Sequence, residues 1–271
     1  MTDAIRVDGL KKSYSGREVL KGLSFQVGRG EIFALLGVNG AGKTTALECL
    51  EGLRACGGGS VAVNGRVGIQ LQSSSLPAYI RPMEAVRLFA KWNRAEIDAA
   101  MLDALGIAAL GKRPYSALST GQKRRLHLAL ALVGDPDIVF LDEPTAGLDV
   151  EGRVALHAQI RALRDRGKTI VLASHDMAEV ETLCDRIAIL SGGGIVFCGT
   201  VAELTEQVGR RYTISIRTER GERTCETADV ADALLTLLEA CRRQGVAVLD
   251  VKVDRGTLEQ HFIDIAGRMG A

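Results

Sequence analysis

The 271-residue sequence contains few aromatic residues and no long apolar run. Phe, Trp and Tyr make up 4% of the chain, which argues against a surface that stacks nucleic-acid bases on aromatic rings. No segment approaches the ~18 consecutive apolar residues of a transmembrane helix. The N-terminus lacks the apolar run of a signal peptide. From these absences we expect a protein that stays in the cytosol and binds no nucleic acid.

An excess of one charge and closely paired cysteines are also lacking. Lys and Arg number 34 against 33 for Asp and Glu, so the net charge of +1 indicates no strongly charged partner. The six cysteines form no C-x-x-C pair, which argues against metal and redox motifs. We expect reduced thiols that are mostly buried as small apolar side chains.

Apolar runs alternate with helical patterns through most of the chain. Residues 32–36 form a continuous apolar run, as in a central parallel strand buried on both faces. Similar runs return at residues 137–141, 169–173 and 186–190, with helical stretches between them. Strands that alternate with helices predict an α/β fold with a parallel sheet.

Two other patterns interrupt this alternation. Short alternating segments at residues 4–9, 23–27 and 60–63 indicate further strands, and the glycines of residues 57–60 predict a turn. Residues 73–133 are helical in character, so we expect a helical insertion between two strands of the sheet.

The C-terminal region has a pattern of its own. Apolar and polar residues alternate at 212–216 and again at 247–253, on either side of an amphipathic helix expected over residues 228–243. Leu258, Phe262 and Ile265 fall on one helical face. The pattern predicts a small α+β appendix.

A glycine-rich loop follows the first buried strand. Residues 37–44 match G-x-x-x-x-G-K-[ST] and precede a helix expected over residues 43–53. The glycines let consecutive backbone N–H groups point at phosphate oxygens, and the helix N-terminus adds a positive dipole. We expect Lys43 to reach the β- and γ-phosphates of a nucleotide, and the Thr44 hydroxyl to hold Mg²⁺.

Two adjacent carboxylates, Asp142 and Glu143, end a second buried strand. The carboxyl ends of strands are where an α/β sheet binds its ligands. We expect Asp142 to hold Mg²⁺ and Glu143 to act as the base that polarises the attacking water. Acidic pairs at strand ends also occur as helix caps.

A third motif, Leu-Ser-Thr-Gly-Gln at residues 118–122, lies between these two. Ser119 is predicted to cap a helix over residues 120–133, and the N–H groups at that helix start suit an anion. The cations at residues 123–125 are interpreted as a solvated basic face, with a nearby nucleotide or partner as the alternative. Taken together, residues 4 to about 208 resemble the nucleotide-binding domain of ATP-binding cassette (ABC) proteins. Thr120 departs from the commoner glycine of that family.

The resemblance implies the fold of a P-loop NTPase over residues 1–208, with an antiparallel β subdomain and the helical insertion at about 73–133. Residues 209–271 then form a separate small α+β domain.

The resemblance also implies roles for residues outside the three motifs. Tyr14 matches the aromatic residue that stacks on adenine, although a strand tyrosine packing on its neighbour would look the same. Gln72 matches the glutamine that contacts Mg²⁺, with Gln70 as the alternative. His175 matches the switch histidine that touches the γ-phosphate.

The expected nucleotide-binding residues are Tyr14, Gly37, Asn39, Gly40, Ala41, Gly42, Lys43, Thr44, Thr45, Ser119, Gly121 and Gln122. The expected catalytic residues are Glu143, His175 and Gln72. The expected metal ligands are Thr44, Gln72 and Asp142.

The resemblance further implies ATP and Mg²⁺ as cofactors and a second nucleotide-binding subunit, expected as a homodimer. Ser119 of one copy would face the γ-phosphate bound by the other, and residues 146–149 would cross to the second subunit. With no membrane span of its own, the chain would serve a separate integral permease, docked near residues 76–80. We therefore expect a peripheral protein on the inner face of the cell membrane.

The direction of transport depends on the appendix. Residues 256–262 resemble the Pro-Thr-Leu-Glu-x-x-Phe segment of ATPases that serve drug, polysaccharide and lipid exporters of the daunorubicin-resistance type, with Gly256 in place of the usual proline. We expect an export ATPase. The alternatives are a soluble ABC ATPase acting on ribosomes or DNA and a phosphotransferase. Ser174-His175-Asp176 as a hydrolase triad and Cys184 as a nucleophile are set aside, because adjacent residues do not form a triad and nothing indicates a lowered thiol pKa.

Overall fold

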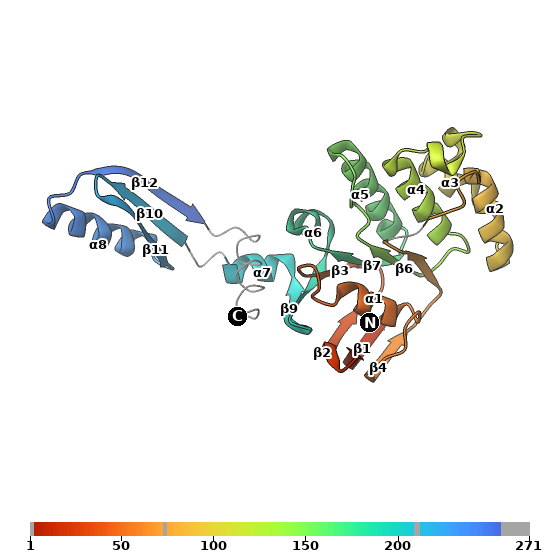
Figure 1. The fold of residues 1–271 in the computed structure, drawn as a ribbon, viewed down its shortest axis with the longest axis horizontal. Coiled ribbons are helices and arrows are strands. Elements are labelled where there is room, and N and C mark those ends of the chain that lie inside the picture. The colour runs from red at the N-terminus through yellow and green to blue at the C-terminus, as the bar shows by residue number, and fades with distance from the viewer. Residues whose placement is uncertain (1–2, 73–74, 209–211, 256–271) are drawn as a thin grey trace. The chain divides into compact units, whose positions relative to one another are not determined.

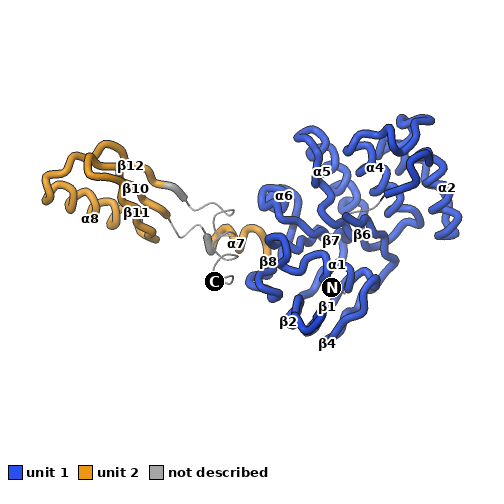
Figure 2. Tube along the Cα trace, viewed as in Figure 1, with its two compact units in different colours: residues 1–198 blue, residues 199–271 orange. Residues whose placement is uncertain are grey.

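The computed structural model describes residues 3–72, 75–208 and 212–255, and within these ranges the chain forms three β-sheets (Figure 1). The chain divides into two compact units, residues 1–198 and 199–271 (Figure 2). Among the described residues no helix is long and apolar enough to cross a membrane.

The central sheet of unit 1 has the strand order β5-β6-β7-β3-β8-β9, and the pairs that join β5, β6, β7, β3 and β8 are parallel. Every residue of β3, β6 and β7 is buried, because both faces of the sheet are covered. The strands are β3 (Ile32–Leu36), β5 (Val67–Gln70), β6 (Ile138–Asp142), β7 (Thr169–Ser174), β8 (Arg186–Ser191) and β9 (Gly194–Thr200). The expected α/β class with a parallel sheet is confirmed.

An antiparallel sheet packs with α1 (Lys43–Leu50) on one face of the central sheet. Its order is β2 (Arg17–Val27), β1 (Ile5–Tyr14) and β4 (Gly58–Val63). The turn expected at residues 57–60 is wrong, because β4 begins at Gly58. A Cβ atom on Gly59 would lie 2.2 Å from the Gly9 carbonyl oxygen, so glycine is needed there for close strand contact.

Helices fill the remaining connections of unit 1. The helices between β5 and β6 are α2 (Pro82–Asn93), α3 (Ala99–Ala104) and α4 (Thr120–Ala131), and those beside β7 are α5 (Val150–Asp165) and α6 (Met177–Leu183). The helix expected over residues 43–53 is shorter, because α1 ends at Leu50 and Gly52 adopts a φ of 74°.

Unit 2 contains α7 (Val201–Val208) and a three-stranded sheet with the order β11-β10-β12 among its described residues. These strands are β10 (Tyr212–Thr218), β11 (Gly221–Thr227) and β12 (Val248–Arg255). The helix α8 (Val230–Arg243) packs on Ile214 and Ile216, which are fully buried. The expected helical face of Leu258, Phe262 and Ile265, and the 256–262 segment, lie outside the described residues.

The expectation for the cysteines is wrong in one respect. All six lie in the described ranges, but only Cys49 and Cys241 among them are buried. Cys56 and Cys198 are exposed, since the first follows the turn after α1 and the second lies on β9, the last strand in the order of its sheet.

Candidate active site

The phosphate loop connects β3 to α1 by way of two positions that exclude a side chain. Gly42 adopts a φ of 104°, and a Cβ atom there would lie 2.8 Å from the side chain of Leu20. At Gly37 it would lie 2.8 Å from the Leu190 carbonyl oxygen. Lys43 is 6% exposed, and its Nζ donates to the Gly37 and Val38 carbonyl oxygens at 2.7 and 3.3 Å. The loop therefore surrounds the Lys43 side chain and bonds its amino group.

A pocket of about 1050 Å³ opens in front of this loop. It brings together nine of the expected site residues, namely Tyr14, Asn39, Gly40, Gly42, Lys43, Thr44, Thr45, Gln72 and Glu143. Gly37 and Ala41 are buried and do not line it. Two cations stand over the Tyr14 ring, with Arg54 Cζ 5.3 Å and Lys12 Nζ 5.7 Å from its centroid.

Asp142 ends β6, next to Glu143, and is only 3% exposed. Burial raises the pKa of its carboxyl group, against a hydrogen bond from the Thr44 side chain that lowers it. Burial likewise lowers the pKa of Lys43, while Glu143 and Asp142 oppose that change. Asp142 Oδ1 has no hydrogen-bond partner among the described residues. A carboxylate, a hydroxyl and the Gln72 amide offer the oxygen ligands that Mg²⁺ prefers, so these residues fit that ion.

Glu143 is held between two neighbours. Gln72 Nε2 donates to its Oε2 at 2.8 Å, and His175 Nδ1 lies 3.1 Å from its Oε1. Its backbone takes the left-handed conformation, with a φ of 47°, which is uncommon for a residue with a side chain. Gln70 is 2% exposed and points into the core, so the structure brings Gln72 and not Gln70 to this carboxylate.

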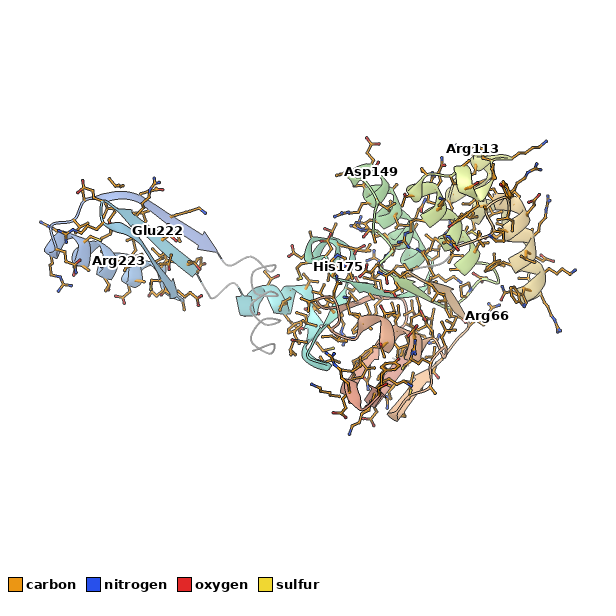
Figure 3. All side chains as sticks on the ribbon, in the orientation of Figure 1. Arg66, Arg113, Asp149, His175, Glu222 and Arg223 are labelled. Atoms are coloured by element: carbon orange, nitrogen blue, oxygen red, sulfur yellow. The ribbon has the colours of Figure 1, made fainter. Side chains whose placement is uncertain are left out.

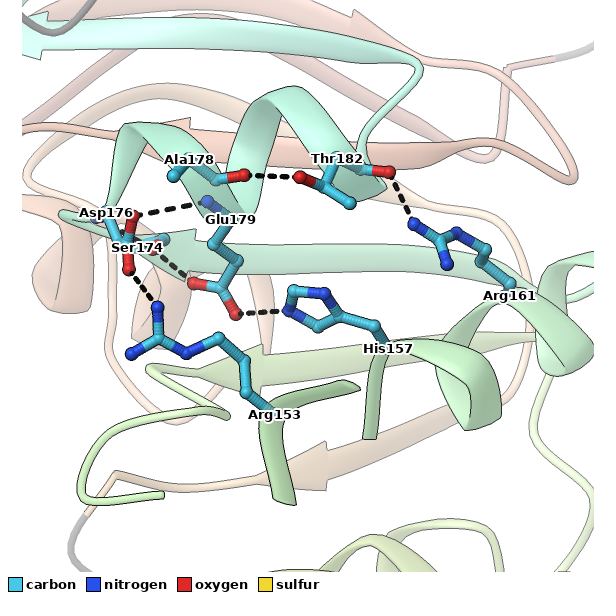
Figure 4. A network of polar contacts seen from close by, with 8 residues as sticks. All are labelled: Arg153, His157, Arg161, Ser174, Asp176, Ala178, Glu179 and Thr182. Carbon is cyan, nitrogen blue, oxygen red and sulfur yellow. Dashed lines mark hydrogen bonds and ion pairs between the residues drawn. The ribbon is translucent and has the colours of Figure 1, made fainter. Parts of the chain in front are cut away.

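A buried polar network supports the segment that carries His175 (Figure 4). The Ser174 hydroxyl donates to Glu179 Oε2 at 2.5 Å, and Glu179 Oε1 lies 3.5 Å from His157 Nε2 on α5. Arg153, one turn earlier on α5, donates to Asp176 at 2.9 Å. Sequence reasoning missed this network; the available signal was two polar residues four apart on α5. Since Ser174 bonds Glu179, its hydroxyl is not paired with His175 as a hydrolase triad requires.

The surroundings of Cys184 also argue against a role as a nucleophile. Burial raises the pKa of the Cys184 thiol well above its ordinary value. A thiolate is the nucleophilic form, so this environment disfavours covalent catalysis.

Ser119 lies at the start of α4, as expected, but it lines a different hollow from the phosphate-loop pocket. Its Oγ accepts from the Gln122 N–H at 3.3 Å, and the Gln122 side chain accepts from the Ser119 N–H at 3.0 Å. Ser119, Gly121 and Gln122 line a separate hollow of about 540 Å³, together with residues 147–149. Asp149 caps α5 there (Figure 3). The structure does not bring these residues to Lys43 within one chain.

The backbone of Gln72 and the backbone of Leu76 are each bonded by a side chain. Arg124 donates to the Gln72 carbonyl oxygen at 3.3 Å. The Tyr115 hydroxyl bonds the Leu76 backbone and lies 2.9 Å from His127 Nε2 in the interior. Burial lowers the pKa of His127 to about 4, so the imidazole is neutral near pH 7.

The solvated basic face expected at residues 123–125 is therefore wrong. All three side chains are partly buried. Lys123 stands 5.1 Å from the centroid of the Tyr115 ring, and Arg125 donates to the Leu105 carbonyl oxygen at 3.5 Å.

Known proteins resemble this chain in sequence and in structure. Residues 20–146 match the ABC transporter family. The chain is 30% identical over 304 aligned residues to the daunorubicin resistance ATP-binding protein DrrA3 of Streptomyces coeruleorubidus, covering 97% of this chain and 96% of that protein. It belongs to the ABC transporter ATP-binding family. The Nod factor export ATP-binding protein I of Paraburkholderia xenovorans is 40% identical, over 70% of this chain and 68% of the relative.

A solved ATP-binding subunit of an ABC transporter superposes with a TM-score of 0.68 and 26% identity, over 76% of this chain and 93% of that structure. The resemblance seen in the sequence is confirmed, together with the P-loop NTPase fold. ABC ATP-binding domains bind ATP and hydrolyse it to power transport, and this chain is an ATPase of that family.

Proposed function

We propose that this protein is the nucleotide-binding subunit of an ABC export system and hydrolyses MgATP to drive a separate membrane permease. The observation that carries the proposal is the position of Glu143, between Gln72 and His175 at the wall of the phosphate-loop pocket. A carboxylate held there can take a proton from water that attacks the γ-phosphate.

Each neighbour has a distinct part in this chemistry. Glu143 is the general base, Gln72 orients the water and contacts the metal, and His175 touches the γ-phosphate. Thr44 and Asp142 hold Mg²⁺, which when bound neutralises negative charge on the phosphates. Lys43 neutralises the β- and γ-phosphate oxygens. Tyr14 is positioned to stack on the base.

A complete site needs a second chain. Ser119 lies at its own hollow at the exposed start of α4, which suits a phosphate held by a partner. We infer a homodimer in which Ser119, Gly121 and Gln122 of one copy close over the γ-phosphate of the other. Residues 147–149 share that hollow, and residues 146–149 cross with them.

Export and a permease are supported by the relatives and by one exposed surface. The relatives carry names of drug resistance and Nod factor export. Leu88 and Trp92, one turn apart on α2, are 50% and 78% exposed, and Tyr79 before that helix is 86% exposed. Large apolar side chains exposed together mark protein contacts. A permease docked here would place the chain on the inner face of the cell membrane.

The test uses a variant that binds ATP without turning it over. Glu143→Gln protein is expressed in its native cells, trapped with ATP, and recovered from gently solubilised membranes for mass spectrometry. We expect a polytopic membrane protein in stoichiometric amount. The control is Glu143→Gln combined with Ser119→Arg, which cannot close the dimer and should recover less permease. Recovery only with ribosomes, DNA or other soluble partners would overturn the export role and leave the ATPase intact.

A further inference from the structure

The strand β12 of unit 2 is an edge strand with exposed apolar side chains. Among the described strands it pairs with β10 alone, and Figure 1 shows it at the margin of the small sheet. Leu249, Val251 and Val253 are 59%, 39% and 42% exposed. An edge strand of this kind is a template for pairing with another strand, and soluble proteins protect such edges.

The opposite edge of the same sheet carries no large apolar side chain. Glu222 and Arg223 lie on β11 (Figure 3), and both are exposed. Both edge strands carry charged side chains, which discourage pairing with another chain, but only β12 has large apolar residues between its charges. The two edges therefore differ, and only β12 combines an edge position with apolar side chains among the described strands of this sheet.

The apolar face of this sheet extends beyond the helix that covers it. Val251 lies directly across from Ile216, and Val253 from Ile214, so each pair shares one face. Ile214 and Ile216 are fully buried under α8, whereas the two valines are not. A strand added to β12 would continue the sheet and cover the valines.

The sequence of β12 is complementary to itself when two copies run antiparallel about Val251. In that register Val251 faces Val251 and Asp250 faces Lys252 of the other copy, whereas Leu249 lies at an irregularity of the strand and falls outside the regular pairing. Opposite charges and apolar pairs directly across a strand pair stabilise it. Within its own sheet, Asp250 also lies 3.5 Å from Arg217 on the neighbouring strand β10, so opposite charges pair between β10 and β12 as well.

Neighbouring registers lack this property. Pairing about Asp250 would place two aspartates face to face, and pairing about Lys252 would place two lysines face to face. Like charges directly opposite destabilise a strand pair. A slip of one residue would set charged side chains against apolar ones. The strand thus specifies one symmetric register.

We propose that two copies of this chain pair through antiparallel β12 strands about Val251, joining their small sheets into one continuous sheet. The contact is isologous, since the same strand serves both copies. It is independent of nucleotide and of the ATPase assignment. It would link two chains while their nucleotide sites are open, so that closure over nucleotide takes place within one assembly at a raised effective concentration.

The first experiment is cross-linking of the full-length chain without nucleotide. Val251→Cys is introduced with Cys56 and Cys198 replaced by serine, and the protein is oxidised mildly. Directly opposed residues of antiparallel strands have Cα atoms about 4.5–5.5 Å apart, within the range that a disulfide spans. We expect rapid formation of a disulfide-linked dimer. Thr224→Cys, exposed on β11, is the matched control and should link much more slowly.

The second experiment exchanges the charges. Asp250→Lys and Lys252→Asp should each weaken self-association measured by sedimentation equilibrium, by roughly tenfold in the dissociation constant. The double variant Asp250→Lys/Lys252→Asp restores opposite charges across the pair and should associate like the wild type. All samples carry Ser119→Arg, so that closure over nucleotide does not contribute to the dimer. If the single variants were weak only because the sheet had misfolded, the second charge exchange would not restore self-association.

Three results would overturn the proposal. The first is equal cross-linking at positions 251 and 224. The second is a double charge variant that associates as weakly as the single ones. The third is a chain ending at residue 255 that links through Val251→Cys when the full chain does not, because residues 256–271 would then be the occupant of this edge.

Discussion

The phosphate loop and the start of α4 are the two ends of the proposed nucleotide site in unit 1, and they are built differently. At the phosphate loop, Lys43 and Asp142 are buried and fixed by their neighbours, and Glu143 has a hydrogen-bonding partner on either side. At the start of α4, Ser119 is exposed at a hollow and is bonded to Gln122 of its own helix. One end is organised within a single chain, and the other presents a helix terminus outward.

This difference separates binding from turnover. A single chain should bind nucleotide alone, since Lys43, Thr44 and Thr45 already line the pocket at the start of α1. Hydrolysis in the proposed dimer also requires the α4 terminus of the other copy. Changes at the phosphate loop should therefore affect nucleotide binding or the chemical step, whereas changes at the start of α4 should affect hydrolysis alone.

The largest expected effect is at Glu143. Glu143→Gln keeps the side-chain size and removes the base, so ATP hydrolysis should fall by about 10³-fold. ATP affinity should change little, because the phosphate loop is untouched. Phosphate release and equilibrium ATP binding measure the two steps. Glu222→Gln, on the exposed strand β11, is the control with full activity, and normal turnover in Glu143→Gln would sink the assignment of the base.

Ser119→Arg tests the other end of the comparison. A bulky cation at the start of α4 should block closure over the partner's nucleotide and reduce hydrolysis by about 10²-fold, since an oriented phosphate contact is lost. Nucleotide binding to the isolated chain should be unchanged. The matched control is Ser116→Arg, also exposed and three residues earlier. Loss of nucleotide binding in Ser119→Arg would mean that Ser119 serves its own chain instead.

His175→Ala should slow hydrolysis by roughly 10- to 100-fold, because a positioned hydrogen-bonding group beside Glu143 is removed. Ser174→Ala should have a smaller effect in the same direction. It removes the 2.5 Å bond to Glu179 and loosens the segment that carries His175. Single-turnover rates at saturating ATP measure both. An unchanged rate in His175→Ala would remove this residue from the site.

Much of the phosphate-loop end could be predicted from the sequence, because its groups are neighbours along the chain. Lys43 and Thr44 follow one buried strand, and Asp142 and Glu143 follow another, so a parallel sheet brings them to the same edge. The choice between Gln70 and Gln72 required the structure. β5 ends at Gln70, whose side chain is buried, and Gln72 lies beyond the strand end where it reaches Glu143.

The contacts around α4 and α5 could not be predicted in this way. Tyr115 with His127, and His157 with Glu179, join residues whose meeting depends on how helices pack in three dimensions. The interpretation of residues 123–125 as a solvated face failed for the same reason. Charge along a helix does not reveal that the carbonyl oxygens of Gln72 and Leu105 lie within reach of Arg124 and Arg125.

The smallest expected effects concern stability, and they have opposite signs at the two ends. Burial raises the pKa of Glu51, at the end of α1, from 4.5 to about 7. The folded chain then holds a proton that the unfolded chain has released, so stability falls as pH rises from 4.5 to about 7. Glu51→Gln should remove this decline and stabilise the chain by about 1–2 kcal/mol at pH 8, allowing for partial solvent screening.

His127, on α4, works in the other direction. Burial lowers its pKa from 6.5 to about 4, so the unfolded chain takes up a proton that the folded chain refuses, and stability falls as pH drops from 6.5 to about 4. His127→Gln keeps a partner for Tyr115 and should flatten the acid side of the stability curve by about 1–2 kcal/mol. Urea unfolding of the magnesium-free protein between pH 4.5 and 8 measures both variants. If each variant flattens only its own side of the curve, the two ends respond to pH separately; a change on both sides for either variant would show that the ends are coupled through the core.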